Sequence, residues 1–203
     1  GKPLVHHLMN EDLKQAYELA KTESVSLVPV TPAFLQRLNA TLMRTTGSVH
    51  SVTGGSFDSS KGEFRLCGVT AGHSYMNYLK VPAKIDEFCA ILQAKQKTMG
   101  TFREQYELSF NIHLNLVTIH PWIDGNGRTA RLLMNYIQFC YHLFPTKIFK
   151  EDREEYILSL RQCQNEETNH PFLDFMALQL KKSLALEIER FNASRKERFN
   201  FMF

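Results

Sequence analysis

The sequence lacks the marks of several protein classes. It contains no CxxC pair, and its four cysteines, Cys67, Cys89, Cys140 and Cys163, lie 22, 51 and 23 residues apart. This spacing favours reduced thiols over a zinc site or a disulfide framework. No apolar run approaches the roughly 18 residues that a membrane span needs, and no secretory signal opens the chain. We therefore expect a cytoplasmic protein without a membrane segment.

Charge of one sign is nowhere concentrated. The 24 basic and 21 acidic residues are interspersed and leave a net charge of +3. Because no basic stripe is present, composition does not favour a nucleic-acid partner. The chain also has no GxxxxGK(S/T) loop, which excludes a P-loop nucleoside triphosphatase, and no GxSxG signature of a hydrolase.

The chain does have enough apolar material for one domain, or one domain with small appendages. Of its 203 residues, 43% are hydrophobic, including 15 Phe and 7 Tyr. Apolar residues recur at helical spacing over most of the length. The predicted helices span about residues 10–21, 31–47, 82–97, 102–119, 126–143, 151–164 and 171–191.

One region departs from the helical pattern. Residues 47–62 are rich in Gly and Ser, which predicts a loop. Residues 63–81 carry β-formers interrupted by Gly68 and Gly72, which predicts a short, irregular β-hairpin. We therefore expect a mainly α fold, a helical bundle with one β-hairpin.

A loop joins the two helices predicted to be most buried, and it concentrates the chemistry of the chain. Residues 120–131 read His-Pro-Trp-Ile-Asp-Gly-Asn-Gly-Arg-Thr-Ala-Arg. His120 is a base that changes protonation near neutral pH, and Asp124 is an oxygen donor suited to Mg²⁺. Because the loop is held by a helix on either side, its groups are expected to be rigidly placed.

The second half of the same loop predicts an anion site. Gly125, Asn126 and Gly127 form a turn whose amides can approach an anion at the start of the following helix. Arg128 and Arg131 lie three residues apart on one face of that helix and suit phosphate oxygens. Together with the base and the carboxylate, these groups indicate a polyphosphate site.

Simpler roles exist for some of these residues. Asp124 can cap the next helix, a role compatible with holding a metal. The two arginines could form a solvated helix face, but their position directly after the amide turn favours phosphate contact. For His113, on the preceding helix, core packing is the expected role.

The motif resembles the signature of Fic-domain proteins, HxFx(D/E)GNGRxxR. Trp122 stands where the family usually has Phe, an aromatic replacement that should still anchor the loop. The stretch from Gly62 through the predicted hairpin resembles the family's flap. The matching motif positions are His120, Asp124, Gly125, Asn126, Gly127, Arg128 and Arg131.

The resemblance implies a protein adenylyltransferase that transfers AMP from ATP to a Tyr, Thr or Ser hydroxyl of a target protein. His120 would be the general base and Asp124 would hold Mg²⁺. Gly125, Asn126 and Gly127 would bind the α- and β-phosphates, and Arg128 and Arg131 the β- and γ-phosphates. A target segment would dock along residues 64–80 as an added strand.

Two alternatives stay open: removal of AMP from a modified protein by the same residues, and a non-catalytic nucleotide-sensing module.

Family members are often restrained by a helix bearing (S/T)xxxE(G/N). Here Ser183 and Glu187 have the spacing, but Ile188 replaces Gly or Asn. We expect instead that an inhibitory helix lies upstream of Gly1 or comes from a separate antitoxin protein; self-association is left open.

The resemblance also implies a division of the chain by role. Residues 1–59 would form N-terminal helices that pack on the core, and residues 192–203 a C-terminal tail. The Fic core would span residues 60–191, with the flap at 62–81 and the motif at 120–131.

Overall fold

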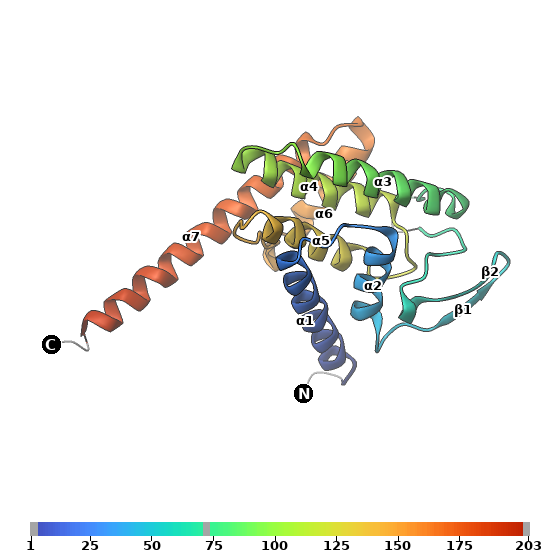
Figure 1. Cartoon of the computed structure of the whole chain (residues 1–203), viewed down its shortest axis with the longest axis horizontal. Coiled ribbons are helices and arrows are strands. Elements are labelled where there is room, and N and C mark those ends of the chain that lie inside the picture. Colours follow the sequence, from blue (N-terminus) through green and yellow to red (C-terminus); the bar gives the residue numbers. More distant parts are fainter. Residues whose placement is uncertain (1–3, 71–73, 201–203) are drawn as a thin grey trace. The chain divides into compact units, whose positions relative to one another are not determined.

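The computed structural model describes residues 4–70 and 74–200, with side chains to residue 193. The chain forms two compact units, Gly1–Leu143 (unit 1) and Phe144–Phe203 (unit 2). The described part is mainly helical with one two-stranded hairpin, which confirms the predicted fold class (Figure 1). The division by role at residues 59/60 and 191/192 stays a prediction.

Unit 1 carries most of the secondary structure. Its elements are α1 (Leu4–Val25), α2 (Pro32–Met43), β1 (Val49–Val52), β2 (Gly55–Asp58), α3 (Val81–Gln96), α4 (Phe102–Ile119) and α5 (Asn126–Cys140), with short 3-10 helices at Ser59–Lys61 and Tyr78–Lys80. Unit 2 contains a 3-10 helix at Lys150–Asp152, then α6 (Arg153–Glu166) and α7 (His170–Asn200). α7 continues beyond the predicted end near residue 191.

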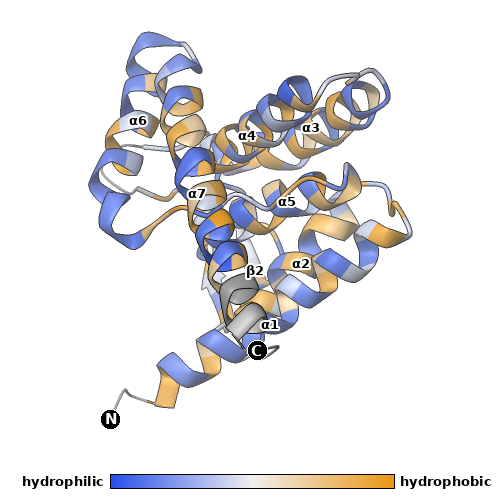
Figure 2. Cartoon of the chain, turned by 90° about the vertical axis from the view of Figure 1, so that its left-hand side faces the viewer, coloured by the Kyte–Doolittle hydropathy of each residue, from blue (hydrophilic) through white to orange (hydrophobic). Residues whose placement is uncertain are grey.

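Local sequence explains where the helices begin. The side chain of Thr31 accepts a hydrogen bond from the Phe34 amide, and Pro32 occupies the first turn of α2. Thr101 and Glu104 form a reciprocal capping box at the start of α4. Along the helices, apolar and polar residues alternate in bands, as the orange and blue segments of α2 show (Figure 2).

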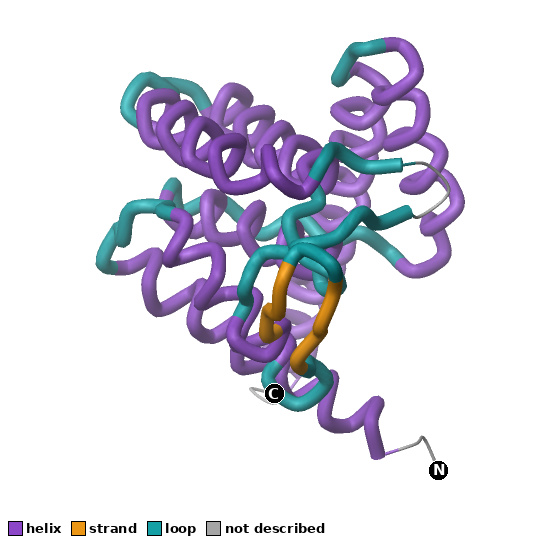
Figure 3. The backbone as a smooth tube through the Cα atoms, turned by 90° about the vertical axis from the view of Figure 1, so that its right-hand side faces the viewer, coloured by secondary structure: helices purple, strands orange, loops and turns teal. Residues whose placement is uncertain are grey.

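The predicted position of the hairpin was wrong. β1 and β2 lie within the stretch predicted to be a loop, pair antiparallel with Val49 opposite Asp58, and are joined at Thr53–Gly54 (Figure 3). In the described residues of 63–81, pairing is limited to one bridge, between Thr70 and Ser74.

A buried side chain gives the physical reason for this difference. The guanidinium of Arg65 donates hydrogen bonds at 2.8 Å to the carbonyls of Cys67 and Met76. These carbonyls, one on each arm of residues 63–81, are therefore held by a side chain rather than by a strand ladder.

The core of unit 1 surrounds the motif loop. α4 packs on α5, and α5 also contacts α1 and α2. Asn39 of α2 donates to the Thr129 hydroxyl of α5 at 3.0 Å, a buried polar link between the two helices. The loop between α4 and α5 is thus held by elements on several sides.

Two expectations from composition can be compared with the structure. The four cysteines are free thiols, as predicted. Among the described helices, none combines the length and the apolar character needed to cross a bilayer.

Candidate active site

His120 stands where α4 ends. It adopts a left-handed backbone conformation, with φ 52° and ψ 60°, and its N–H donates to the Leu116 carbonyl at 3.0 Å. Its Nδ1 lies 3.3 Å from the carbonyl oxygen of Val117. Because a carbonyl oxygen only accepts, this contact places the proton on Nδ1 and makes Nε2 the basic ring nitrogen.

Trp122 anchors the loop after His120. Its side chain is fully buried, and the indole N–H donates to the carbonyl of Gly62 at 2.9 Å. The Trp122 amide donates to Asn126 Oδ1 at 3.0 Å, and Asn126 Nδ2 donates back to the Trp122 carbonyl at 2.9 Å. The Asn126 side chain therefore clamps the loop, so its predicted role with phosphate rests on its backbone amide.

Gly125 precedes α5 as a left-handed N-cap, with φ 81° and ψ −4°. A Cβ at this position would lie 2.7 Å from Asn39 Nδ2, so both the backbone and the space around it favour glycine. Its carbonyl accepts from the Thr129 amide at 2.8 Å. The amides of the first turn of α5 have no intrahelical acceptors, and the helix dipole adds partial positive charge there.

Asp124 and Arg128 form a charged pair beside this helix start. Arg128 Nη2 lies 3.3 Å from Asp124 Oδ2, and the side chain of Asp124 is 68% exposed against 18% for Arg128. Arg128 Nη1 is buried and has no hydrogen-bond partner among the described residues. A buried guanidinium N–H without an acceptor is costly, and an oxygen of a bound anion would satisfy it.

Asp124 is the group of the motif loop predicted to hold a metal ion. Among the described residues, no group of three or more His, Cys, Asp and Glu side chains could hold a metal ion. A single exposed carboxylate, Asp124, nevertheless fits Mg²⁺, which is commonly held by one or two carboxylates together with substrate phosphates.

Arg131 lies on the face of α5 that adjoins α4. Its charge, after burial, contributes to lowering the pKa of His113 to about 3. His113 is therefore a neutral core residue, the role expected from the sequence.

The sequence analysis missed three side chains that shape the site. Arg65 is 1% exposed, and its Nε donates to the carbonyl of His120 at 2.8 Å. Asn39 lies against Gly125 and Thr129. Tyr75 stacks on His120 with ring centroids 3.7 Å apart. Each of the three contacts a residue that is far away in the sequence, so no local sequence pattern indicated its role.

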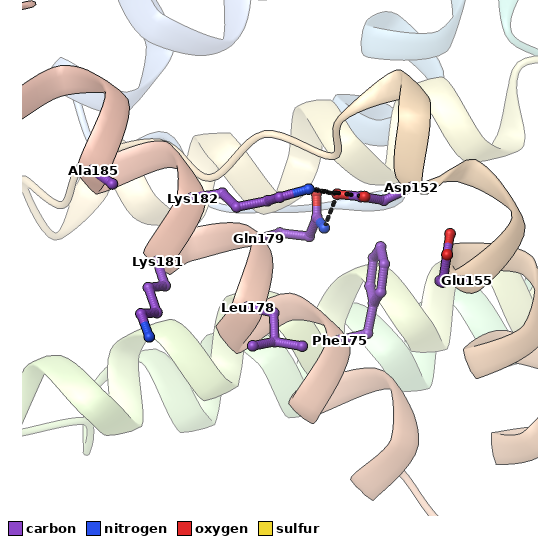
Figure 4. Close-up of a pocket in the computed structure, with 8 residues that line it drawn as sticks. All are labelled: Asp152, Glu155, Phe175, Leu178, Gln179, Lys181, Lys182 and Ala185. Atoms are coloured by element: carbon purple, nitrogen blue, oxygen red, sulfur yellow. Dashed lines mark hydrogen bonds and ion pairs between the residues drawn. The ribbon is translucent and has the colours of Figure 1, made fainter. Parts of the chain in front are cut away.

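Cavities also lie outside the motif loop. A cavity of about 210 Å³ in unit 1 is lined by residues of α3 and α4 together with Met76, and it includes Ile119 next to His120. A cavity of about 400 Å³ in unit 2 is lined by residues of α7 together with Asp152 and Glu155 (Figure 4). In it, Gln179 and Lys182 both donate to Asp152, at 2.7 and 2.6 Å, and these bonds lower the pKa of its carboxyl group.

Ser183 and Glu187, which have the spacing of the inhibitory (S/T)xxxE(G/N) motif, lie in unit 2. Ser183 is buried, and its hydroxyl oxygen accepts from the Lys147 amide at 3.3 Å. Glu187 pairs with Arg190 at 3.6 Å. Both side chains thus have contacts within their own unit.

The matching family model, curated relatives from Drosophila and three matching solved structures are all named for the Fic domain or family. The model of the Fic/DOC family matches residues 29–138. Protein adenylyltransferase Fic of Drosophila grimshawi is 45% identical over 74 residues, which cover 36% of this chain and 15% of that protein. The matched segment therefore represents a small part of the curated relatives.

Solved structures extend the similarity over more of the chain. A Fic-domain-containing signaling protein of Bacteroides thetaiotaomicron is 25% identical, with a TM-score of 0.73 over 89% of this chain and 71% of that chain. Fic-1 (residues 134–508) of C. elegans is 21% identical, with a TM-score of 0.77 over 96% of this chain and 54% of that chain. The N-terminal Fic domain of a Bartonella quintana protein with bound ADP is 16% identical, with a TM-score of 0.53 over 84% and 83%.

Proposed function

Because the chain belongs to the Fic/DOC family, we propose that it is a protein adenylyltransferase that transfers AMP from ATP to a hydroxyl group of a target protein. The observation that carries the proposal is the position of His120. Its Nδ1 is bound to Val117, which leaves Nε2 as the base, six residues before an anion-binding helix start. The names of the Drosophila relatives support the same activity, and the ADP bound to the Bartonella quintana domain is in keeping with a nucleotide substrate.

The nucleotide phosphates would bind at the start of α5. The amides of Asn126 and Gly127 supply donors, and Arg128 and Arg131 add fixed positive charge. The Gly125 amide donates to Asp124 Oδ1 at 2.5 Å and would join them once that carboxylate turns to Mg²⁺. The buried Nη1 of Arg128 gains an acceptor when a phosphate oxygen arrives. Thus the helix start and the two guanidinium groups hold the polyphosphate chain and the charge that develops on it.

Transfer follows from the basicity of His120. Its Nε2 takes the proton of the target hydroxyl as that oxygen forms a bond to the α-phosphorus. The bond from the α-phosphorus to the bridging oxygen breaks, and pyrophosphate leaves with the electron pair. Asp124 would hold Mg²⁺, which when bound neutralises phosphate charge.

The target protein would lie along residues 64–80. Extended segments commonly dock by adding a strand to an exposed edge. The cavity beside Met76 and Ile119 supports this location, because it offers mainly apolar space for a target side chain near the end of α4. The inhibitory element would lie upstream of Gly1 or on a partner protein, with Ser183 and Glu187 as the alternative.

The test is incubation with α-labelled ATP, Mg²⁺ and lysate, beside a His120→Ala control. Label on protein that depends on His120 supports the proposal. Nucleotide binding with no label in either sample contradicts it and supports a sensor. Loss of label from protein modified beforehand, without forward transfer, contradicts it in favour of the reverse reaction.

A further inference from the structure

An aromatic ring covers one face of the proposed base. The rings of Tyr75 and His120 are stacked, with centroids 3.7 Å apart and planes 23° from parallel. Tyr75 is half-buried and follows the bridge between Thr70 and Ser74. Its amide donates to the Val69 carbonyl at 3.4 Å, so its backbone is held to the opposite arm of this segment.

A single buried cation binds the backbone of His120 and of Met76, the residue that follows Tyr75. Arg65 Nε donates to the carbonyl of His120 itself, and Nη2 donates to the carbonyl of Met76, directly after Tyr75, both at 2.8 Å. The Arg65 amide also donates to the Pro121 carbonyl at 3.0 Å. The contact between the rings therefore rests on a rigid frame rather than on two independent side chains.

We propose that Tyr75 is a positioning residue for His120, whose ring orients the imidazole and stabilises its protonated form during transfer. The inference rests on the proposed function and deepens it. The Val117 carbonyl holds Nδ1 at one edge of the imidazole, and the Tyr75 ring covers one of its faces. The direction of Nε2 is then set before substrate binds.

The chemistry of the transfer step uses the same contact. When Nε2 accepts the proton of the target hydroxyl, the ring becomes an imidazolium. A cation over an aromatic face within about 6 Å of the centroid is attracted by the ring quadrupole. The stack therefore favours the charged form that appears during transfer, which lowers the barrier without holding ATP more tightly.

The ring rather than the hydroxyl of Tyr75 carries this role. Burial raises the pKa of the Tyr75 phenol, so the side chain stays neutral at physiological pH. Removing the hydroxyl leaves the aromatic face in place. Tyr75→Phe and Tyr75→Leu thus separate the two parts of the side chain.

The experiment compares these variants in steady-state transfer of labelled AMP. Tyr75→Leu is expected to lower kcat about tenfold to a hundredfold, as for other losses of orientation at a reacting group, with KM for ATP within about twofold of wild type. Tyr75→Phe should keep kcat near wild type. Tyr106→Leu, a half-buried tyrosine near the opposite end of α4, is the matched control and should leave kcat unchanged.

Nuclear magnetic resonance of the His120 ring gives a readout independent of turnover. Wild type and Tyr75→Phe should show the Nδ1–H tautomer, with carbon-bound ring protons shifted upfield by the neighbouring aromatic ring. Tyr75→Leu should lose that shift and show mixed tautomers. Absence of the shift in wild type, or an unchanged kcat in Tyr75→Leu, overturns the inference.

The two readouts separate failure of the inference from failure of the proposed function. If no transfer depends on His120, the proposed function fails. If transfer occurs but does not depend on the Tyr75 ring, only the positioning role fails. Should Tyr75→Leu unfold, the shift in wild type and in Tyr75→Phe still decides whether the stack exists, and kcat in Tyr75→Trp tests the ring's role.

Discussion

The guanidinium of Arg65 and the main-chain carbonyl of His120 lie 2.8 Å apart, although 55 residues separate them in sequence. This bond ties the end of α4 to the segment that carries Tyr75. Arg65 is buried and meets three carbonyl groups, those of His120, Cys67 and Met76. Burial accordingly lowers the pKa of its guanidinium group, and the hydrogen bonds offset part of the cost of desolvation.

Replacing Arg65 should damage both stability and activity. In Arg65→Met the three carbonyls lose their shared donor, and we expect a loss of about 2–4 kcal/mol in the free energy of unfolding. Arg65→Lys should recover only part of it, since an ammonium group lacks the planar fork. Urea unfolding measures the loss. Arg37→Met, at an exposed ion pair with Glu23, is the control and should change stability by less than about 1 kcal/mol.

Trp122→Phe should destabilise the protein even though Phe is usual at this motif position. The substitution leaves the buried Gly62 carbonyl without its indole donor, at a cost of about 1–3 kcal/mol. Thermal unfolding followed by circular dichroism would measure it. A melting temperature equal to that of wild type would show that the Trp122–Gly62 bond contributes nothing.

Gly125→Ala should lower the free energy of unfolding much more than Gly127→Ala does. At Gly125 a methyl group meets Asn39 Nδ2 at 2.7 Å on a left-handed backbone, so the strain should cost about 1–3 kcal/mol. At Gly127 the methyl group would lie 3.5 Å from Arg131 Nη1, an ordinary contact. Chemical unfolding of the two variants measures this difference. Equal losses of unfolding free energy at both positions would contradict the assignment of strain to Gly125.

Arg128→Ala should weaken nucleotide binding while leaving the fold intact. The side chain offers a buried Nη1 that a phosphate oxygen would satisfy. We expect ATP affinity to fall about tenfold or more, measured by calorimetry. Arg103→Ala, at the other end of α4, is a control of equal charge and should bind ATP as wild type does. Unchanged affinity in Arg128→Ala would exclude a phosphate contact.

Acid should destabilise unit 1 through His113. Burial, with the charge of Arg131, lowers its pKa to about 3, while the unfolded chain keeps a value near 6.5. Between these values the unfolded state binds the proton and the folded state does not. Stability therefore falls as pH drops from about 6.5 towards 3, by at most about 1.4 kcal/mol per pH unit from this group.

The measurement for His113 is the slope of unfolding free energy against pH. His113→Gln should flatten the slope below pH 6.5, whatever its effect on absolute stability. His50→Gln, at a half-buried position of strand β1, is the control. Equal slopes in wild type and His113→Gln would mean that His113 is not the group that titrates.

Much of the fold and of the motif could be predicted from local patterns. Apolar residues at helical spacing, with caps such as Thr31 and Thr101, indicate helices because both act within a few residues. Residues 120–131 predicted the helix start after Gly125 for the same reason, since Gly125 and the amides that follow it adjoin in sequence. The boundaries were less accurate, as at α1, which begins at Leu4 rather than near residue 10.

The sequence by itself determined the helical character, the order of the helices and the identity of the motif groups, because those depend on neighbours along the chain. Only the tertiary structure decided where the hairpin forms and what surrounds His120. Beside their local hydrogen bonds, Gly125, Trp122 and His120 contact Asn39, Gly62 and Tyr75, which lie about 45 to 90 residues away, so the selection of these long-range partners depends on packing and on satisfying buried carbonyls. No local pattern encodes those partners.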